Sequence, residues 1–376
     1  MFRKWLNKIE DRIIKISGQD YTPRPLSLEW VLVCLSRLYG AGVGFRLWLY
    51  QKKIFRQKKL PCFVISIGNI VAGGSGKTPM TQYLAELLKK IGKKPVVISR
   101  GYKGRYNGDV LIVSDGHRIF SSAEESGDEP FMMATRLSFP VVVGKDRFNA
   151  GLEAMAAFNP DVAVLDDGFQ HVRLKRNLDI LLFDFKNPLE NKRMLPAGRL
   201  RETLQTSGKR ADAVVFTRCP EKNENGNDID ALLQSYPDRP VFKTFHKPYI
   251  RWWVKKDRKL PEIDSDMDVL PGKKAVLFSG LARNRAFYDS MADSGINILY
   301  HLEFKDHHRY KTSDFLMINS VALKQQADFI LTTEKDWVKI GRDIKWETDF
   351  LVIGIRMEFE YPEKFEDFLV TEMEKK

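Results

Sequence analysis

The segment GGSGKTP, residues 73–79, combines the residue types that bind phosphate groups. Backbone N–H groups of such a loop donate to phosphate oxygens, and the helix that follows adds a favourable dipole. Lys77 would neutralise the β- and γ-phosphates, and the Thr78 hydroxyl would ligate Mg²⁺. The loop residues that would surround the phosphates are Gly73, Gly74, Ser75 and Gly76.

The residues around this loop favour a phosphate site. Val71 replaces the glycine that opens the strict G-x-x-x-x-G-K-[ST] pattern, but the apolar run 62–70 leads into the loop and a helical run follows it. Pro79 suits the first turn of that helix, where no N–H is needed. The alternative, a glycine-rich connection without a ligand, does not explain why strand, loop and helix occur together.

A carboxylate for the metal is supplied by Asp166 and Asp167, which end the apolar run 161–165. Adjacent residues of a strand point to opposite faces, so we expect the two carboxylates to have separate roles. Which of them ligates the metal stays open. The alternative is an ordinary turn rich in Asp and Gly, but the phosphate loop favours the metal.

The elements that position these groups alternate between β-rich apolar runs and helical stretches from residue 61 onward. This order predicts an α/β fold like that of the P-loop NTPases, with a mostly parallel sheet and helices on both faces. The chain turns polar at 223–228, so we place a domain boundary near residue 240. A core domain at 61–240 is then followed by a smaller α/β domain at 241–376.

The N-terminal segment, 1–60, stands apart from this order. Its stretch 25–53 is rich in Leu, Val, Trp and Tyr, but Glu29, Arg37 and Arg46 interrupt it, so it falls short of the about 20 apolar residues of a spanning helix. We predict a helix that lies in a membrane interface, with an amphipathic helix packed on the core as the alternative. Charges interrupt the apolar residues before this stretch, so no signal peptide is expected.

Composition limits the partners. The chain has 376 residues, of which 43% are hydrophobic and 29% charged, and its formal charge is +12. These values are typical of a globular protein, and the positive charge favours anionic partners such as nucleotides or anionic lipids. Cys34, Cys62 and Cys219 form no CxxC pair, which favours neither a zinc site nor a disulfide framework. No recognition motif or aromatic platform points to nucleic acid.

A set of motifs relates the chain to a known family. They are, in order, GNIVAGGSGKTP, SRGYKG, SGDEP, DDGFQH, LPAGRLRE, DHHRY and TTEKDWVK. From about residue 26 onward the chain resembles the tetraacyldisaccharide 4'-kinases, the lipid A 4'-kinases of Gram-negative bacteria. The resemblance implies transfer of the γ-phosphoryl group of ATP, with Mg²⁺, to the 4'-hydroxyl of tetraacyldisaccharide 1-phosphate, a lipid A precursor. It also implies a location at the cytoplasmic face of the inner membrane.

The resemblance further implies residue roles. Asp128 would pair with a histidine and help to deprotonate the acceptor hydroxyl, and Glu129 would reach the Mg²⁺ shell. His307 is assigned as that histidine from its motif, with His308 beside it as the alternative. Because Asp128 and His307 lie in different predicted domains, the domains would have to close to form the pair. The residues implied in substrate binding are Arg100, Tyr102, Arg147, Gln170, His171 and Arg201.

Other functions stay open beside this interpretation. A P-loop NTPase that couples hydrolysis to conformational change would need no lipid acceptor. A GTPase would need a guanine-reading motif, and in TTEKDWVK the residues Lys335 and Asp336 are adjacent, so GTP is not inferred. A membrane-attached nucleotide-binding scaffold would lack a base such as His307. The segment 332–339 itself either joins the nucleotide site or simply begins a helix.

Overall fold

The computed structural model describes residues 16, 18, 21–136, 138–220, 229–256, 262–265, 267–340 and 344–375. Residues 1–15 of the predicted N-terminal segment 1–60 lie outside the described residues, as does the polar stretch 223–228.

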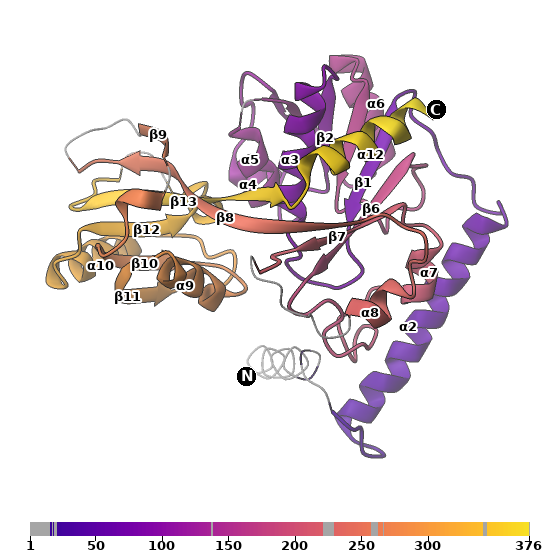
Figure 1. Ribbon diagram of the computed structural model, residues 1–376, viewed down its shortest axis with the longest axis horizontal. Coiled ribbons are helices and arrows are strands. Elements are labelled where there is room, and N and C mark those ends of the chain that lie inside the picture. Colours follow the sequence, from indigo (N-terminus) through magenta and orange to yellow (C-terminus); the bar gives the residue numbers. More distant parts are fainter. Residues whose placement is uncertain are drawn as a thin grey trace.

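Within the described residues, thirteen strands form one sheet in the order β11-β10-β12-β13-β8-β7-β6-β1-β5-β2-β4-β3, with β9 paired to β8 (Figure 1). Its pairs are parallel except β3–β4, β8–β13 and β8–β9. The predicted α/β fold with a mostly parallel sheet is therefore confirmed. The strands are β1 Phe63–Gly68, β2 Pro95–Ser99, β3 Val110–Asp115, β4 Pro140–Gly144, β5 Val162–Asp166, β6 Leu178–Asp184, β7 Ala213–Thr217, β8 Val241–Val254, β9 Glu262–Ser265, β10 Lys274–Ser279, β11 Asn297–Glu303, β12 Phe329–Thr333 and β13 Asp349–Phe359.

Helices cover both faces of the sheet because alternate side chains of its strands point to opposite sides. In β1, Ile65 packs in one core cluster with Leu84 of α3, whereas Val64 packs in another with Ala150 of α6. The helices are α2 Leu28–Gln51, α3 Lys77–Lys90, α4 Ala123–Ser126, α5 Asp128–Ala134, α6 Arg147–Phe158, α7 Leu204–Gly208, α8 Ile229–Leu233, α9 Asn284–Asp293, α10 Thr312–Lys324, α11 Glu334–Trp337 and α12 Pro362–Glu374.

Two long strands connect the halves of the molecule. We refer to β1–β7 with their helices as the P-loop part, and to β10–β12 with α9, α10 and α11 as the C-terminal part. β8 pairs with β7 through residues 241–243 and with β13 through residues 244–254, so the sheet is continuous between the parts (Figure 1). After β13 the chain returns, and Phe365 and Leu369 of α12 join the core cluster of Ile65. The domain division near residue 240 stays a prediction.

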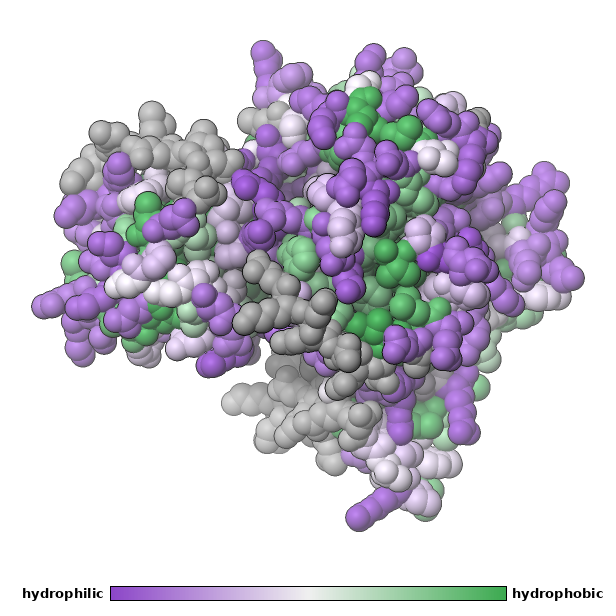
Figure 2. Space-filling model, viewed as in Figure 1, coloured by the Kyte–Doolittle hydropathy of each residue, from purple (hydrophilic) through white to green (hydrophobic). Residues whose placement is uncertain are grey.

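The N-terminal helix α2 lies on the outside of the molecule. Leu32 and Ser36 are its buried residues, and the Ser36 hydroxyl donates to the Met194 carbonyl oxygen at 2.9 Å. Apolar side chains such as Leu38 and Phe45 are 70% and 61% exposed, and green side chains appear along this edge in Figure 2. A helix packed on the core would bury its apolar residues, so the alternative interpretation is not supported. By length and composition α2 could also cross a membrane. The expectation that its charged residues leave too few apolar residues for a spanning helix is therefore wrong.

Candidate active site

The phosphate-binding loop joins the end of β1 to the start of α3, as the sequence predicts. Two of its positions need glycine, because Gly73 has a φ of 138° and Gly76 a φ of 77°, a region that residues with a Cβ rarely adopt. Lys77, the first residue of α3, lies 3.4 Å from the Gly73 carbonyl oxygen and 3.3 Å from Asn69 Oδ1. Its ammonium group is therefore folded back over the loop.

Residues of strands β7 and β8 pack against the loop. The Thr217 hydroxyl donates to the Ser75 carbonyl oxygen at 3.1 Å. His246 packs so closely that a Cβ at Gly76 would lie 3.0 Å from its Nε2. Burial lowers the pKa of His246 to about 3, and the positive charge of Arg218 lowers it further, so the imidazole is neutral. An uncharged ring can thus lie directly beneath the loop.

Asp166 lies at the end of β5, buried, on the α3 side of the site. Its carboxylate accepts hydrogen bonds from the Ser99 hydroxyl at 3.1 Å and the Thr81 hydroxyl at 3.3 Å. Burial, followed by the negative charges of Glu129 and Asp167, raises the pKa of Asp166 to about 7. The positive charge near this carboxylate is too small to offset its burial and the two neighbouring negative charges.

Asp167 is turned differently, in a left-handed conformation with a φ of 52°. Arg201 Nη1 donates to both of its carboxylate oxygens at 3.0 and 3.1 Å, and Lys77 Nζ lies 3.8 Å away. Burial raises the pKa of Asp167, but Lys77 and Arg201 outweigh it and hold the pKa below its usual value. The two adjacent acids therefore have different partners: Asp166 faces hydroxyl groups and Asp167 faces cations.

Asp128 and His307 meet across the two parts of the molecule. Asp128 is the first residue of α5, and His307 lies in the turn after β11, with a φ of 60°. His307 Nδ1 lies 2.9 Å from Asp128 Oδ2, with side chains that are 19% and 15% exposed. Burial raises the pKa of Asp128, but the hydrogen bond with His307 and the charges of Lys339 and Lys335 lower it below its usual value.

The neighbouring histidine, His308, faces away from Asp128. Its Nε2 lies 2.9 Å from Asp314 Oδ2, and its ring is stacked on Phe304 with a centroid distance of 4.6 Å. The structure therefore brings His307, and not His308, to the predicted partner.

The predicted substrate-binding residues divide into two groups. Arg201 and Gln170 join the phosphate loop, since Arg201 Nη1 donates to Gln170 Oε1 at 3.1 Å and Gln170 Nε2 donates to the Asn69 carbonyl oxygen at 2.8 Å. Arg147 is buried; burial lowers its pKa, although the charges of Asp166 and Asp167 act against this.

The other three lie at the edges of the site. His171 Nε2 lies 3.8 Å from Asp146 Oδ1, and burial lowers the His171 pKa to about 4. Arg100 and Tyr102 follow β2 and are exposed, and the Tyr102 ring centroid lies 6.2 Å from that of His307. These two side chains could reach a ligand without rearrangement of the core.

The loop, the separated acids and the carboxylate–histidine pair are the kinds of groups that phosphoryl transfer requires. The sequence model of the family described as Tetraacyldisaccharide-1-P 4'-kinase matches residues 28–374. The chain belongs to the tetraacyldisaccharide 4'-kinase family. The interpretation as an ATP-dependent kinase in lipid A biosynthesis is thereby confirmed over that as an NTPase without a lipid acceptor.

Individual members of the tetraacyldisaccharide 4'-kinase family agree over most of the chain. A protein named tetraacyldisaccharide 4'-kinase from Desulfatibacillum aliphaticivorans is 38% identical over 348 residues, 92% of each chain. One from Geobacter metallireducens is 41% identical over 312 residues, 83% of this chain and 88% of its own. The crystal structure of "apo" form LpxK from Aquifex aeolicus in complex with ATP covers 92% of this chain and 100% of its own, with 33% identity and a TM-score of 0.72.

The acids of this kinase fit Mg²⁺. In proteins Mg²⁺ usually takes one or two carboxylates together with substrate phosphates and water. Among the residues that the structure describes, no three His, Cys, Asp or Glu side chains gather closely enough to hold a metal by themselves. Asp166, whose pKa is raised to about 7, is a buried carboxylate that a cation would stabilise. Thr78 lies one turn of α3 before Thr81, whose hydroxyl donates to Asp166.

Sequence reasoning missed several residues of the kinase site. Asn69, Thr81 and Ser99 hold Lys77 and Asp166 as described above. Asn69 and Ser99 lie in motifs without being singled out, and Thr81 lies in α3, two residues after the first motif ends. Lys335 lies 3.3 Å from Asp306 and 4.0 Å from Glu129, so the TTEKDWVK segment reaches the site. The TTEKDWVK motif was the only sign in the sequence that Lys335 matters, and the residues it contacts, Asp306 and Glu129, lie far from it in the sequence.

Proposed function

We propose that this chain transfers the γ-phosphoryl group of ATP to the 4'-hydroxyl of tetraacyldisaccharide 1-phosphate, with Asp128 and His307 as the proton-accepting pair. The observation that carries this proposal is the 2.9 Å contact of His307 Nδ1 with Asp128 Oδ2. A carboxylate in this position keeps the proton on Nδ1, so Nε2, which lies 3.7 Å from Asp306 Oδ2, is the nitrogen that would accept another.

The chemistry then follows from the positions of the side chains. The acceptor O–H bond breaks and its proton moves to Nε2 of His307, while the oxygen forms a bond to the γ-phosphorus. The bond from that phosphorus to the β-phosphate bridging oxygen breaks, and ADP leaves. Lys77 and the N-terminus of α3 offset the negative charge on the phosphates. Arg201, held by Asp167, adds a second cation beside Lys77.

For the metal, we assign Thr78 and Asp166 as ligands, with Glu129 in the surrounding shell. When bound, Mg²⁺ supplies charge neutralisation to the phosphates. Asp167 is better suited to orient Arg201, because its oxygens are already engaged by that guanidinium. Glu129 is 46% exposed and its charge acts on Asp166, which supports a place near the metal.

The acceptor has to be reached at a membrane, and α2 supports this. Its exposed apolar side chains would enter the interface. Burial raises the pKa of its Tyr39, and the positive charge of Arg201 acts against this, so Tyr39 lies near Arg201. The helix would thus hold the site at the cytoplasmic face of the inner membrane, where a lipid headgroup could meet Arg100 and Tyr102. Gln170 and His171, which are partly buried, would line the same site, and the buried Arg147 would support it from the core.

The proposal is tested by phosphate transfer from γ-labelled ATP to tetraacyldisaccharide 1-phosphate in detergent micelles, with and without Mg²⁺. Labelled lipid that requires Mg²⁺ supports it. Labelled inorganic phosphate without labelled lipid would reject the acceptor, and full transfer by an Asp128→Asn variant would reject the proton-accepting pair.

A further inference from the structure

A buried charged cluster lies where the P-loop part, β8 and the C-terminal part meet. It consists of Arg136, which follows α5, Glu334 at the start of α11, and Arg251 and Tyr249 on β8. The side chains of Arg136 and Glu334 are only 14% and 6% exposed. None of these residues belongs to the phosphate loop, the acids or the histidine pair.

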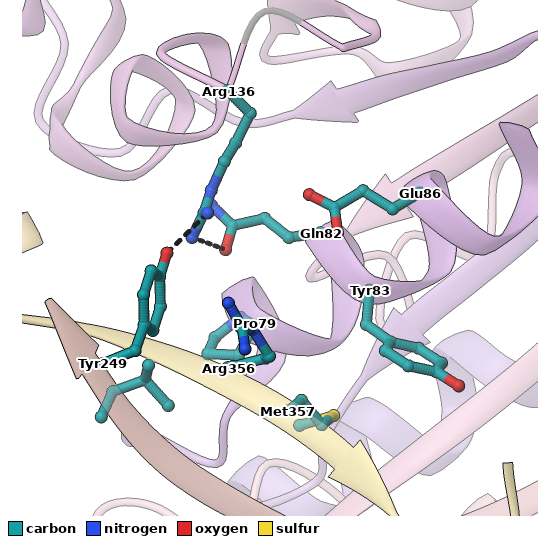
Figure 3. Close-up of a pocket in the computed structure, with 9 residues that line it drawn as sticks. Pro79, Gln82, Tyr83, Glu86, Arg136, Tyr249, Arg356 and Met357 are labelled. Carbon is teal, nitrogen blue, oxygen red and sulfur yellow. Dashed lines mark hydrogen bonds between the residues drawn. The ribbon is translucent and has the colours of Figure 1, made fainter. Parts of the chain in front are cut away.

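Arg136 contacts three elements at once. Its Nη1 donates to the Tyr249 hydroxyl at 2.6 Å, and its Nη2 lies 3.4 Å from Gln82 Oε1 of α3 (Figure 3). The same Nη2 lies 3.3 Å from Glu334 Oε2. Burial lowers the pKa of Arg136, but the charge of Glu334 and the contact with Tyr249 raise it above its usual value, so the guanidinium is charged. A cavity of about 50 Å³ adjoins it, lined also by Glu86 and Arg356.

The cluster lies at the opposite end of α5 from the catalytic pair. α5 begins at Asp128, and Arg136 follows its last turn, about 12 Å away at 1.5 Å per residue. α11 packs against α5. A displacement of α5 along α11 would therefore move Asp128 relative to His307.

The start of α11 connects the cluster to the histidine. Glu334 contacts Arg136, and the next residue, Lys335, lies 3.3 Å from Asp306, the neighbour of His307. Lys335 also lies 4.0 Å from Glu129, the neighbour of Asp128. The two first residues of α11 thus contact both ends of α5.

We propose that Arg136 is a positioning residue for phosphoryl transfer: by holding Glu334, Tyr249 and Gln82 together, it fixes α5 against α11 and keeps Asp128 within hydrogen-bond distance of His307. This inference rests on the proposed role of that pair. A planar guanidinium donates in fixed directions, so three partners set orientation as well as distance, which a lysine ammonium does not do. Gln82 belongs to α3, the helix that begins with Lys77. The contact of Arg136 with Gln82 therefore also fixes the position of the Asp128–His307 pair relative to the phosphate loop.

The test uses the full-length enzyme with Arg136→Met, which keeps the length of the side chain. Glu334 retains Arg251, whose Nε lies 3.7 Å from Glu334 Oε1. We expect kcat for labelled lipid to fall about 10- to 100-fold, since small misplacements of reacting groups have effects of this size. The KM for ATP should stay within about twofold, because the phosphate loop is untouched. The kcat of Arg136→Lys should lie between those of the wild type and of Arg136→Met.

A double-mutant cycle separates positioning from general damage. If Arg136 acts through Asp128, then Asp128→Asn combined with Arg136→Met should be no slower than Asp128→Asn alone. The matched control is Arg285→Met, which breaks an exposed ion pair of 2.8 Å and should leave kcat unchanged. Rates are expressed per folded enzyme, so partial unfolding of a variant does not count as lost turnover.

Three outcomes overturn the inference. Unchanged kcat in Arg136→Met removes the positioning role while the pair stands. Equal losses in the wild-type and Asp128→Asn backgrounds show that the effect does not pass through Asp128. Wild-type kcat in Asp128→Asn itself rejects the proposed function of the pair, which is a separate failure.

Discussion

The adjacent residues His307 and His308 offer a matched test of the proposed base. We would replace each with Asn, because Asn tolerates the left-handed conformation that His307 adopts with a φ of 60°. The amide cannot accept a proton near neutral pH. The same chemical change is thus made at two neighbouring positions, of which only one faces Asp128.

The expected effects of the two substitutions on kcat differ widely. A positioned general base contributes about 10²- to 10⁴-fold, or about 2.7 to 5.5 kcal/mol of barrier, so His307→Asn should lose that much kcat. His308 instead supports its own loop through a 2.9 Å contact with Asp314. Its loss should lower the free energy of unfolding by about 1 kcal/mol and leave kcat within about threefold.

Initial rates of transfer from γ-labelled ATP to lipid give kcat, and isothermal titration with ATP gives the affinity of the loop. Both variants should bind ATP as the wild type does, because neither side chain contacts the loop. The reasoning is refuted if His308→Asn is as slow as His307→Asn, or if His307→Asn turns over at the wild-type rate.

Three further predictions concern the loop, the histidine beneath it and the last helix. Lys77→Met should weaken ATP binding about 10- to 100-fold by titration calorimetry, since it removes a charged contact to the phosphates; unchanged affinity would contradict its role. His246 has a folded pKa of about 3, below its unfolded value, so the unfolded state binds more protons below about pH 6.5 and stability falls as the pH drops. Measured by urea denaturation, the free energy of unfolding of the wild type should fall by about 2 kcal/mol more between about pH 7.5 and 5 than that of His246→Gln. Equal falls would show that His246 does not titrate on unfolding. Phe365→Ala, at a fully buried position, should cost about 3–5 kcal/mol of unfolding free energy, whereas a cost below about 1 kcal/mol would mean that α12 is not part of the core.

The parts of the site that follow one another in the chain were readable from the sequence. A strand, glycines and Lys77 are contiguous, and Asp166 directly ends an apolar run, so local patterns located them. Separate roles for Asp166 and Asp167 were expected from strand geometry, but Asp167 lies just past β5 in a left-handed conformation, and the partners of both acids come from distant segments. Which histidine meets Asp128 depends on the turn after β11, whose conformation no local pattern specifies.

The long strand β8 was not predicted, and its composition explains why. Its 14 residues, VFKTFHKPYIRWWV, include lysines and a proline, and much of it is only partly buried, so no apolar run marks it. The apolar sequence of its partner β13, DFLVIGIRMEF, is typical of a strand, but it does not predict the pairing of the two strands. The continuous sheet, and with it the Arg136 cluster on β8, therefore appears only in three dimensions.

The return of α12 to the first core has a consequence for the newly made chain. Phe365 and Leu369 pack with Ile65 in one cluster, and Phe242 packs against it. The roughly 130 residues between Phe242 and Leu369 take about 6 to 25 s to translate. Until then the P-loop part exposes an unfinished apolar surface, to which chaperones or other nascent chains can bind. A premature stop near the end of the gene would thus damage the core around the first strand rather than merely shorten the protein.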